Sequence, residues 1–137
     1  MRRYFADTSY YVALLVPRDC SHEQAHEFAR ATDFEAVTSE HVLLELSAFF
    51  AKPPHRHGFV TLIDRLRRTP EMTIVPATTE LFEQGLNLYR AHSDKSWSLT
   101  DCISFAIMRD QNINAALTAD HHFEQAGFTA LMTFANP

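Results

Sequence analysis

The fold of this chain is decided by Tyr4-Phe5-Ala6-Asp7, where a short apolar run ends at an acidic residue. Such a run is typical of a buried strand. The residues Ser9–Val16 that follow are apolar almost throughout and stop at Pro17. They predict a buried helix, because proline cannot continue a helix. The stretch therefore combines a strand, an acid and a helix, which is the repeating unit of α/β proteins.

The same alternation continues to the end of the chain. Further strands are predicted at Phe34–Val37, Met72–Val75, Ala115–Ala119 and Leu131–Phe134. Helices are predicted at Ser21–Ala31, from Thr38 or Ser39 to about Ala51, at Gly58–Arg68, from Thr78 or Thr79 to about Ala91, at Ser98–Asp110 and at His121–Gln125. This order favours an α/β fold with a mostly parallel sheet of four to five strands flanked by helices. We expect a single domain over residues 1–137, because no linker or repeat divides the chain.

Composition excludes several classes of protein. The chain has 137 residues, of which 46% are hydrophobic and three are glycine, so it is neither disordered nor of low complexity. Its net charge of −5 argues against coating nucleic acid by bulk charge. Cys20 and Cys102 form no disulfide framework. The apolar run Tyr10–Val16 is too short for a signal peptide, or for a membrane span of roughly 18 residues. We expect a cytoplasmic protein that enters no membrane.

Four acidic residues stand where chemistry is expected in such a fold. Asp7 and Asp120 each follow a predicted strand, and Asp101 lies in the first turn of a predicted helix. Glu45 lies at the rim of the apolar face of its helix, where a carboxylate is costly to bury without a compensating cation. Ligands of parallel sheets bind beyond the carboxyl ends of the strands, so we expect the four carboxylates to meet there.

Helix capping is the alternative explanation for three of these acids. Asp7 and Asp120 are placed to cap the helices that follow them, and Ser98-Leu99-Thr100-Asp101 fits a capping box. Carboxylates that converge instead repel one another unless a cation lies among them. Their oxygen donors suit Mg²⁺ or Mn²⁺ rather than zinc. Such a cation lowers the pKa of bound water and neutralises a phosphoryl oxygen, which is the chemistry of a metal-dependent phosphodiesterase.

The four acids lie in motifs that carry a family resemblance. The motifs are Phe5-Ala6-Asp7-Thr8-Ser9, Leu43-Leu44-Glu45-Leu46, Ser98-Leu99-Thr100-Asp101-Cys102 and Leu117-Thr118-Ala119-Asp120-His121-His122-Phe123. In this order, from Phe5 to about Thr133, the chain resembles the PIN-domain family, and within it the VapC-type ribonuclease toxins of toxin–antitoxin modules. The resemblance implies a PIN-like three-layer sandwich and a metal-dependent endoribonuclease that hydrolyses single-stranded or looped RNA with Mg²⁺ or Mn²⁺. It also implies a homodimer that is silenced by a cognate antitoxin.

The resemblance further implies a role for individual residues. Catalytic and metal-binding roles fall to Asp7, Asp101, Glu45 and Asp120, the last of them partly through water. Thr8 and Thr118 match polar positions that support the acidic cluster. Because no acidic position departs from the pattern of the family, we expect an active enzyme. The pair His121-His122 is a variation to which no effect is assigned.

Other functions compete with this interpretation. His22-Glu23-Gln24-Ala25-His26 has the letters of the zinc metallopeptidase motif, although a surface helix also explains it and no third ligand follows at a familiar spacing. A signalling receiver would need a lysine after a late strand, and neither Lys52 nor Lys95 fits. A non-catalytic PIN-like module that binds RNA or protein is a further alternative, against which the complete set of acids argues.

A basic stretch precedes the third predicted strand. Lys52, Arg56, Arg65, Arg67 and Arg68 fall within 17 residues that contain one acid, Asp64. The four arginines are candidate contacts to the RNA backbone, and a solvated helix face explains them equally well. Phe59 and Trp97 are candidates for stacking on an unpaired base.

Overall fold

The computed structural model describes residues 1–31 and 33–132, and it contains one parallel sheet. The strands are β1 (Arg2–Ala6), β2 (Phe34–Ser39), β3 (Met72–Val75), β4 (Ala115–Leu117) and β5 (Thr129–Ala130). Their order across the sheet is β3-β2-β1-β4-β5, and every neighbouring pair is parallel. The predicted α/β fold with a sheet of four to five strands is therefore confirmed.

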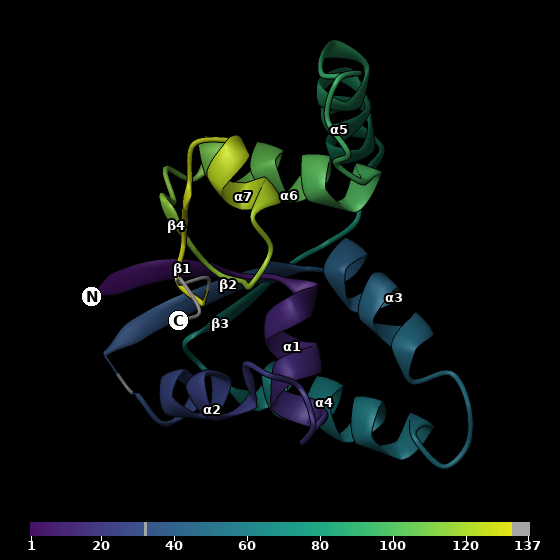
Figure 1. The fold of residues 1–137 in the computed structure, drawn as a ribbon, viewed down its shortest axis with the longest axis vertical. Helices are drawn as coiled ribbons and strands as arrows, with labels where there is room; N and C mark the ends of the chain where they lie inside the picture. The colour runs from purple at the N-terminus through teal and green to yellow at the C-terminus, as the bar shows by residue number, and fades with distance from the viewer. Residues whose placement is uncertain (32, 133–137) are drawn as a thin grey trace.

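Helices cover both faces of this sheet. They are α1 (Thr8–Leu15), α2 (His22–Arg30), α3 (Glu40–Phe49), α4 (Arg56–Arg68), α5 (Thr79–Ala91), α6 (Leu99–Asp110) and α7 (His122–Gln125). Figure 1 shows α1, α2 and α4 on one side of the sheet, and α5, α6 and α7 on the other. The α3 helix lies beyond the carboxyl ends of the strands and contacts both α1 and α6. The arrangement is the three-layer sandwich that was predicted.

The α6 helix is the most deeply buried helix of the sandwich. Every residue from Asp101 to Met108 is buried, and α6 packs against α5, α3 and α7. The rings of Trp97 and Phe123 pack edge-on against Phe105, with centroids 5.0 Å away in each case. Gly85 of α5 lies directly against Ile103, so a side chain at this glycine would force the two helices apart. This packing fixes the N-terminal turn of α6, which carries Asp101.

The central position of β1 decides where the first acid lies. Phe5 and Ala6 of β1 are fully buried, and they pair with Ala116 and Leu117 of β4. The backbone amide of Asp7 then donates to the carbonyl of Leu117 at 3.1 Å. Asp7 therefore leaves the sheet beside the end of β4.

The C-terminal strand differs from the prediction. It comprises Thr129–Ala130, whereas Leu131–Phe134 was expected. Gly127, with a φ of 97°, lies just past the end of α7, as expected, but the chain pairs with β4 directly from Thr129, whose amide donates to the carbonyl of Asn114 at 2.9 Å. Leu131 and Met132 form a turn, although their amides still donate to Ala116 and Thr118, and residues 133 and 134 lie outside the described residues. Within the described part of the chain, no helix is both long and apolar enough to span a bilayer.

Candidate active site

Asp7 lies at the carboxyl edge of the sheet, and the residue is 4% exposed. It occupies the N-cap position of α1 but makes no side-chain capping hydrogen bond, so the capping explanation is wrong for this residue. Its Oδ2 instead accepts hydrogen bonds from Thr118 Oγ1 at 2.8 Å and Ser9 Oγ at 3.2 Å. Two hydroxyl groups thus hold the same oxygen of the carboxylate.

The two hydroxyls are themselves oriented by the backbone after β4. The amide of Ala119 donates to Ser9 Oγ, and the amide of Asp120 donates to Thr118 Oγ1, both at 3.0 Å. Each hydroxyl can therefore accept from an amide and donate to Asp7. Thr118 was expected to support the cluster, and its position agrees with that role. Ser9 was missed, because an isolated serine near a helix start is most simply read as part of a cap.

Asp101 combines a structural contact with a contact in the acidic cluster. Its Oδ2 accepts from the amide of Ser98 at 3.0 Å while its own amide donates to Ser98 Oγ at 3.0 Å, so the predicted capping box is present. The same Oδ2 lies 3.1 Å from Nδ1 of His122. The cap fixes the side chain at the start of α6 and leaves the other carboxylate oxygen for a further contact.

Asp120 meets Asp101 through the same histidine. Its Oδ1 accepts from the backbone amide of His122 at 2.9 Å and lies 3.2 Å from Nδ1 of that residue. His121 is more distant, with Nδ1 3.8 Å from Asp120 Oδ1. The potential ligand atoms of Asp120, His121 and His122 all lie within 4.8 Å of one another. His122 was visible in the sequence only as half of a histidine pair, and nothing local indicated that it bridges two acids.

Glu45 reaches the same edge of the sheet from α3. It is half-buried, and its Oε1 accepts a hydrogen bond from Thr8 Oγ1 at 2.6 Å. Since Thr8 directly follows Asp7, this contact ties Glu45 to the junction of β1 and α1. Thr8 is therefore placed as the resemblance implied, with its hydroxyl on a carboxylate. Charge interactions link Asp7, Asp101 and Asp120, and Glu45 joins this edge through Thr8, while the chemical roles of these residues stay predictions.

The carboxylates are close enough to alter the pKa values of their neighbours. Burial, together with the charges of Asp101 and Asp120, raises the pKa of Asp7 to about 7. The hydrogen bond from Thr118 acts in the opposite direction and lowers this pKa. Burial also raises the pKa of Asp101, and the charge of Asp120 adds to this, while hydrogen bonds from the Ser98 amide and His122 lower it. A divalent cation would relieve this repulsion, and the donor set of carboxylate oxygens fits one.

The basic stretch is placed mainly along α4, on the opposite side of the sheet from α6 and α7 (Figure 1). Arg56 donates to the carbonyl of Ala51 at 2.9 Å, and Arg67 and Arg68 are exposed. Arg65 lines a groove of about 540 Å³ between α1, α2, α4 and the sheet, and none of the four acids lines it. The structure therefore does not join the predicted RNA contacts to the acids.

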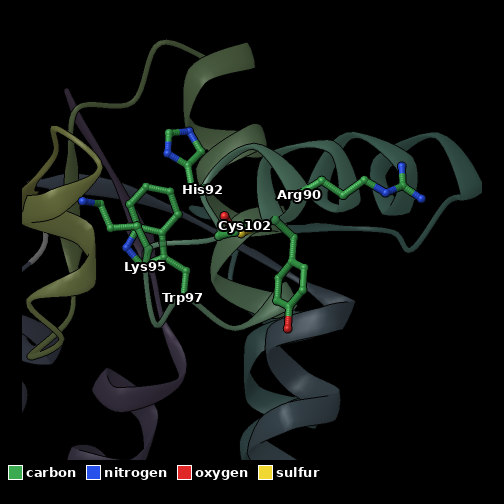
Figure 2. A pocket seen from close by; sticks show the side chains of 7 residues that line it. Arg90, His92, Lys95, Trp97 and Cys102 are labelled. Atoms are coloured by element: carbon green, nitrogen blue, oxygen red, sulfur yellow. The ribbon is translucent and has the colours of Figure 1, made fainter.

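Trp97 lies in the core rather than on a free surface. It is 6% exposed, its Nε1 donates to Gln125 Oε1 at 3.0 Å, and its ring packs on His92 and Phe105. The expectation that it stacks on a base is therefore wrong. Trp97 lines a hollow of about 280 Å³. Figure 2 shows the Arg90 side chain extending away from Trp97 along the helix. Lys95 Nζ lies 3.1 Å from Asp94 Oδ2. These cations are not gathered to hold a phosphate.

The metallopeptidase-like motif has a structural use. His22 Nδ1 lies 2.7 Å from the carbonyl of Ala13, and His26 Nε2 lies 3.2 Å from the carbonyl of Leu14. These contacts fasten α2 to α1. Among residues 1–31 and 33–132, the one cluster of three potential metal ligands contains neither His22 nor His26. The arrangement does not favour the zinc peptidase alternative.

Comparisons with known proteins agree on one family. The model of the PIN domain matches residues 4–129. The chain is 31% identical over 125 residues to the 23S rRNA-specific endonuclease VapC20 of two Mycobacterium tuberculosis strains, which covers 90% of this chain and 94% of the relative. The crystal structure of M. tuberculosis VapC20, a sarcin–ricin loop cleaving toxin, superposes with a TM-score of 0.84 at 27% identity, covering 93% of this chain and 98% of that one.

Two more distant structures share the fold. The VapBC2 complex of Rickettsia felis, bound to a promoter DNA fragment, matches with a TM-score of 0.66 at 14% identity, covering 93% of this chain and 96% of that chain. The FitAcB structure of Neisseria gonorrhoeae matches with a TM-score of 0.61 at 18% identity, covering 93% and 94%. At these identities the likeness concerns the fold alone.

Proposed function

Because this chain belongs to the PIN domain family, we propose that it is an endoribonuclease toxin that hydrolyses RNA phosphodiester bonds with Mg²⁺ or Mn²⁺ held by Asp7, Glu45, Asp101 and Asp120. The predicted family and fold are confirmed by the comparisons, and the predicted ribonuclease function agrees with the endonuclease activity of the curated relative. The specific ion and the roles of single residues are proposals that stand on the geometry.

One observation carries the proposal. Carboxylates from four separate segments gather at the carboxyl edge of the sheet, and the charges of Asp101 and Asp120 both raise the pKa of Asp7. Such repulsion destabilises the folded protein when no cation is present, because burial and neighbouring like charges both disfavour the charged carboxylate. The non-catalytic alternative needs no such cluster. A hard divalent cation, which takes carboxylate oxygens as ligands, gives the cluster a use.

The residues of the site have distinct tasks in this proposal. Asp7 and Asp101 hold the cation, and Asp120 completes the shell partly through water. Thr118 and Ser9 orient the Asp7 carboxylate, and Thr8 orients Glu45. The cation, when bound, supplies the positive charge that neutralises the phosphodiester and lowers the pKa of the attacking water. The buried floor around Asp7 strengthens these electrostatic interactions, because the local dielectric constant is low.

The substrate class follows from the curated relative. VapC20 acts on 23S rRNA, and its structure is that of a toxin that cleaves the sarcin–ricin loop. The similarity extends over 90% of this chain, so we propose a looped ribosomal RNA as its substrate. Looped RNA exposes phosphates and unpaired bases that a duplex hides, which suits a cluster at the edge of a sheet.

We also propose a cognate antitoxin, a homodimer, a cytoplasmic location and a single domain over residues 1–137. Several large apolar side chains are exposed on three helices, which suits a protein that works with a partner: Leu44, Phe49, Val60, Phe82 and Tyr89. Co-purification with the product of an adjacent small gene tests the antitoxin, and sedimentation tests the dimer. A lone, constitutively active and non-toxic monomer would contradict both.

The experiment that tests the function is a map of cleaved cellular RNAs after brief expression, with the Asp7→Ala protein as the control. We expect new 5′ ends in a loop of ribosomal RNA with the wild type and none with the variant. Purified protein should cut the same loop only when Mg²⁺ or Mn²⁺ is present. Cleavage in the presence of a chelator, or equal cleavage by Asp7→Ala, would contradict the proposal.

A further inference from the structure

Two histidines and one acid lie together in the turn that follows β4, at the margin of the acidic cluster. Nδ1 of His122 is 3.2 Å from Oδ1 of Asp120, and Nδ1 of His121 is 3.8 Å from the same oxygen. The two imidazole rings are neighbours, with centroids 4.7 Å apart. One potential ligand atom from each residue lies within 4.8 Å of the other two, and no other such trio occurs in the described part of the chain.

Hydrogen bonding accounts for the position of the His122 ring but not for that of the His121 ring. Nδ1 of His122 is within hydrogen-bond distance of Asp120, whereas 3.8 Å from His121 is longer than a hydrogen bond. The side chain of His121 is 69% exposed, so water can solvate its ring in other rotamers as well. A cation among the three atoms would hold the ring where it lies.

The distances suit a tetrahedral ion with nitrogen ligands. Donor atoms about 2.0–2.1 Å from zinc lie about 3.3–3.4 Å from one another in a tetrahedron. The two nitrogen distances to Oδ1 of Asp120 lie on either side of this value. A small rotation of the exposed His121 ring brings its nitrogen to the required distance, and water takes the fourth position.

The backbone of this turn is fixed by contacts that need no ion. The amide of Asp120 donates to Thr118 Oγ1 at 3.0 Å, and the amide of His122 donates to Asp120 Oδ1 at 2.9 Å. The next residue, Phe123, is fully buried, with its ring centroid 5.0 Å from that of Phe105. Binding of an ion therefore has to order little more than one exposed ring, which keeps its entropic cost low.

We propose that Asp120, His121 and His122 form a second metal site, which binds Zn²⁺ in preference to Mg²⁺. Two imidazole nitrogens and one carboxylate oxygen are donors that zinc accepts, whereas Mg²⁺ takes oxygen ligands. The site differs from the proposed Mg²⁺ or Mn²⁺ site in its nitrogen donors, and it shares Asp120 with that site.

The shared acid gives the second site a consequence for RNA cleavage, and this consequence rests on the proposed function. Zn²⁺ on the two histidines draws Asp120 away from the shell of the catalytic cation. It also adds positive charge beside the other carboxylates, which weakens the binding of another cation there. Zn²⁺ should therefore inhibit cleavage through His121, a residue to which the proposed function gives no task.

The binding test uses the purified full chain, freed of metal by a chelator that is then removed, and ZnCl₂ alone. Calorimetry should show that His121→Ala weakens Zn²⁺ binding by about tenfold or more, since loss of even an outer partner of a metal ligand commonly costs that much. Mg²⁺ binding should be unchanged. The matched control is His55→Ala, because His55 is an exposed histidine outside this turn.

Co²⁺ in place of Zn²⁺ reports the geometry of the site. The visible absorption of tetrahedral Co²⁺ should appear with the wild type and with His55→Ala, and it should be lost with His121→Ala. A wild type that binds no Zn²⁺ would overturn the inference, and so would equal Zn²⁺ affinities in the wild type and His121→Ala.

Cleavage assays keep this inference distinct from the proposed function. With Mg²⁺ alone, the wild type and His121→Ala should cut RNA equally, whatever the result with Zn²⁺. Added Zn²⁺ should inhibit the wild type at a concentration about tenfold or more below the one that inhibits His121→Ala. Equal inhibition of both would contradict the role of the second site. Absence of cleavage with Mg²⁺ or Mn²⁺ would contradict the proposed function and leave the measured Zn²⁺ binding as it stands.

Discussion

Thr118 donates a hydrogen bond from its Oγ1 to Oδ2 of Asp7, at 2.8 Å, across residues 111 positions apart in the chain. The same Oγ1 accepts from the backbone amide of Asp120 at 3.0 Å. One hydroxyl therefore links the acid that follows β1 to the acid that follows β4. Removal of this hydroxyl should disturb both acids while leaving their carboxyl groups chemically unchanged.

Thr118→Val should lower metal affinity by roughly tenfold, because groups that orient metal ligands typically contribute that much. Valine has nearly the shape of threonine, so the buried volume is kept, and the loss of the hydrogen bond raises the pKa of Asp7 further. Calorimetry with Mn²⁺ measures the effect. Thr73→Val, on the exposed side of β3, is the matched control. Equal affinities in both variants would mean that Thr118 does not orient the cluster.

The stability of the metal-free protein should fall as the pH rises. The pKa of Asp7 is about 7 in the folded state against an ordinary value of 3.8. The protonated carboxyl is thus favoured by folding, and its contribution is complete below about pH 4 and lost as the pH passes through about 7. The difference in pKa corresponds to a loss on the order of 4 kcal/mol.

Asp7→Asn isolates this contribution, because the amide has no charge to bury. Urea unfolding in a chelator at pH 5 and pH 8 should show a smaller loss of unfolding free energy in the variant than in the wild type. Mn²⁺ should restore stability to the wild type at pH 8 and have little effect on the variant. Parallel pH profiles for the two proteins would show that Asp7 has no raised pKa.

Asp101→Asn should abolish cleavage, with a loss of roughly a hundredfold or more, because the cation loses a charged ligand. The fold should persist, since the asparagine carbonyl can still accept from the Ser98 amide and keep the capping box. Its metal-free stability should equal or exceed that of the wild type, as repulsion from Asp120 is removed. RNA cleavage assays and unfolding in a chelator measure these outcomes. Asp110→Asn, at the exposed end of the same helix, should cut RNA normally.

Arg67→Ala combined with Arg68→Ala tests whether the basic stretch contacts RNA. If it does, the double variant binds RNA more weakly, and the slope of log affinity against log salt falls by about 1–2, because each lost phosphate contact removes close to one counterion. Binding is measured in the Asp7→Ala background so that the RNA stays intact. Arg30→Ala on α2 is the control. An unchanged slope would assign both arginines to a solvated helix face.

The fold and the four acids were readable from the sequence because their signals are local. Apolar runs such as Tyr4-Phe5-Ala6 predict buried strands, and the acids that follow them belong at the carboxyl edge of a parallel sheet. The capping box at Ser98 and Asp101 was also predictable, since its two residues are neighbours in one turn. The last strand was misplaced because the register of its pairing with β4, which places Thr129 beside Ala115, is a contact between segments and not a local apolar pattern.

Contacts between distant segments were decided only by tertiary packing. The bridge from His122 to Asp101 and the burial of Trp97 depend on how α6 and α7 pack on the sheet. The hydrogen bond from Thr118 to Asp7 depends on the pairing of β1 with β4. A histidine has the same local sequence signal whether it fastens two helices, as His22 does, or joins two acids, as His122 does. The sequence by itself determined which elements form and which acids follow them. The packing of those elements decided which charged and hydrogen-bonding side chains lie close together. Electrostatic and hydrogen-bond energies depend on distance in space and not along the chain.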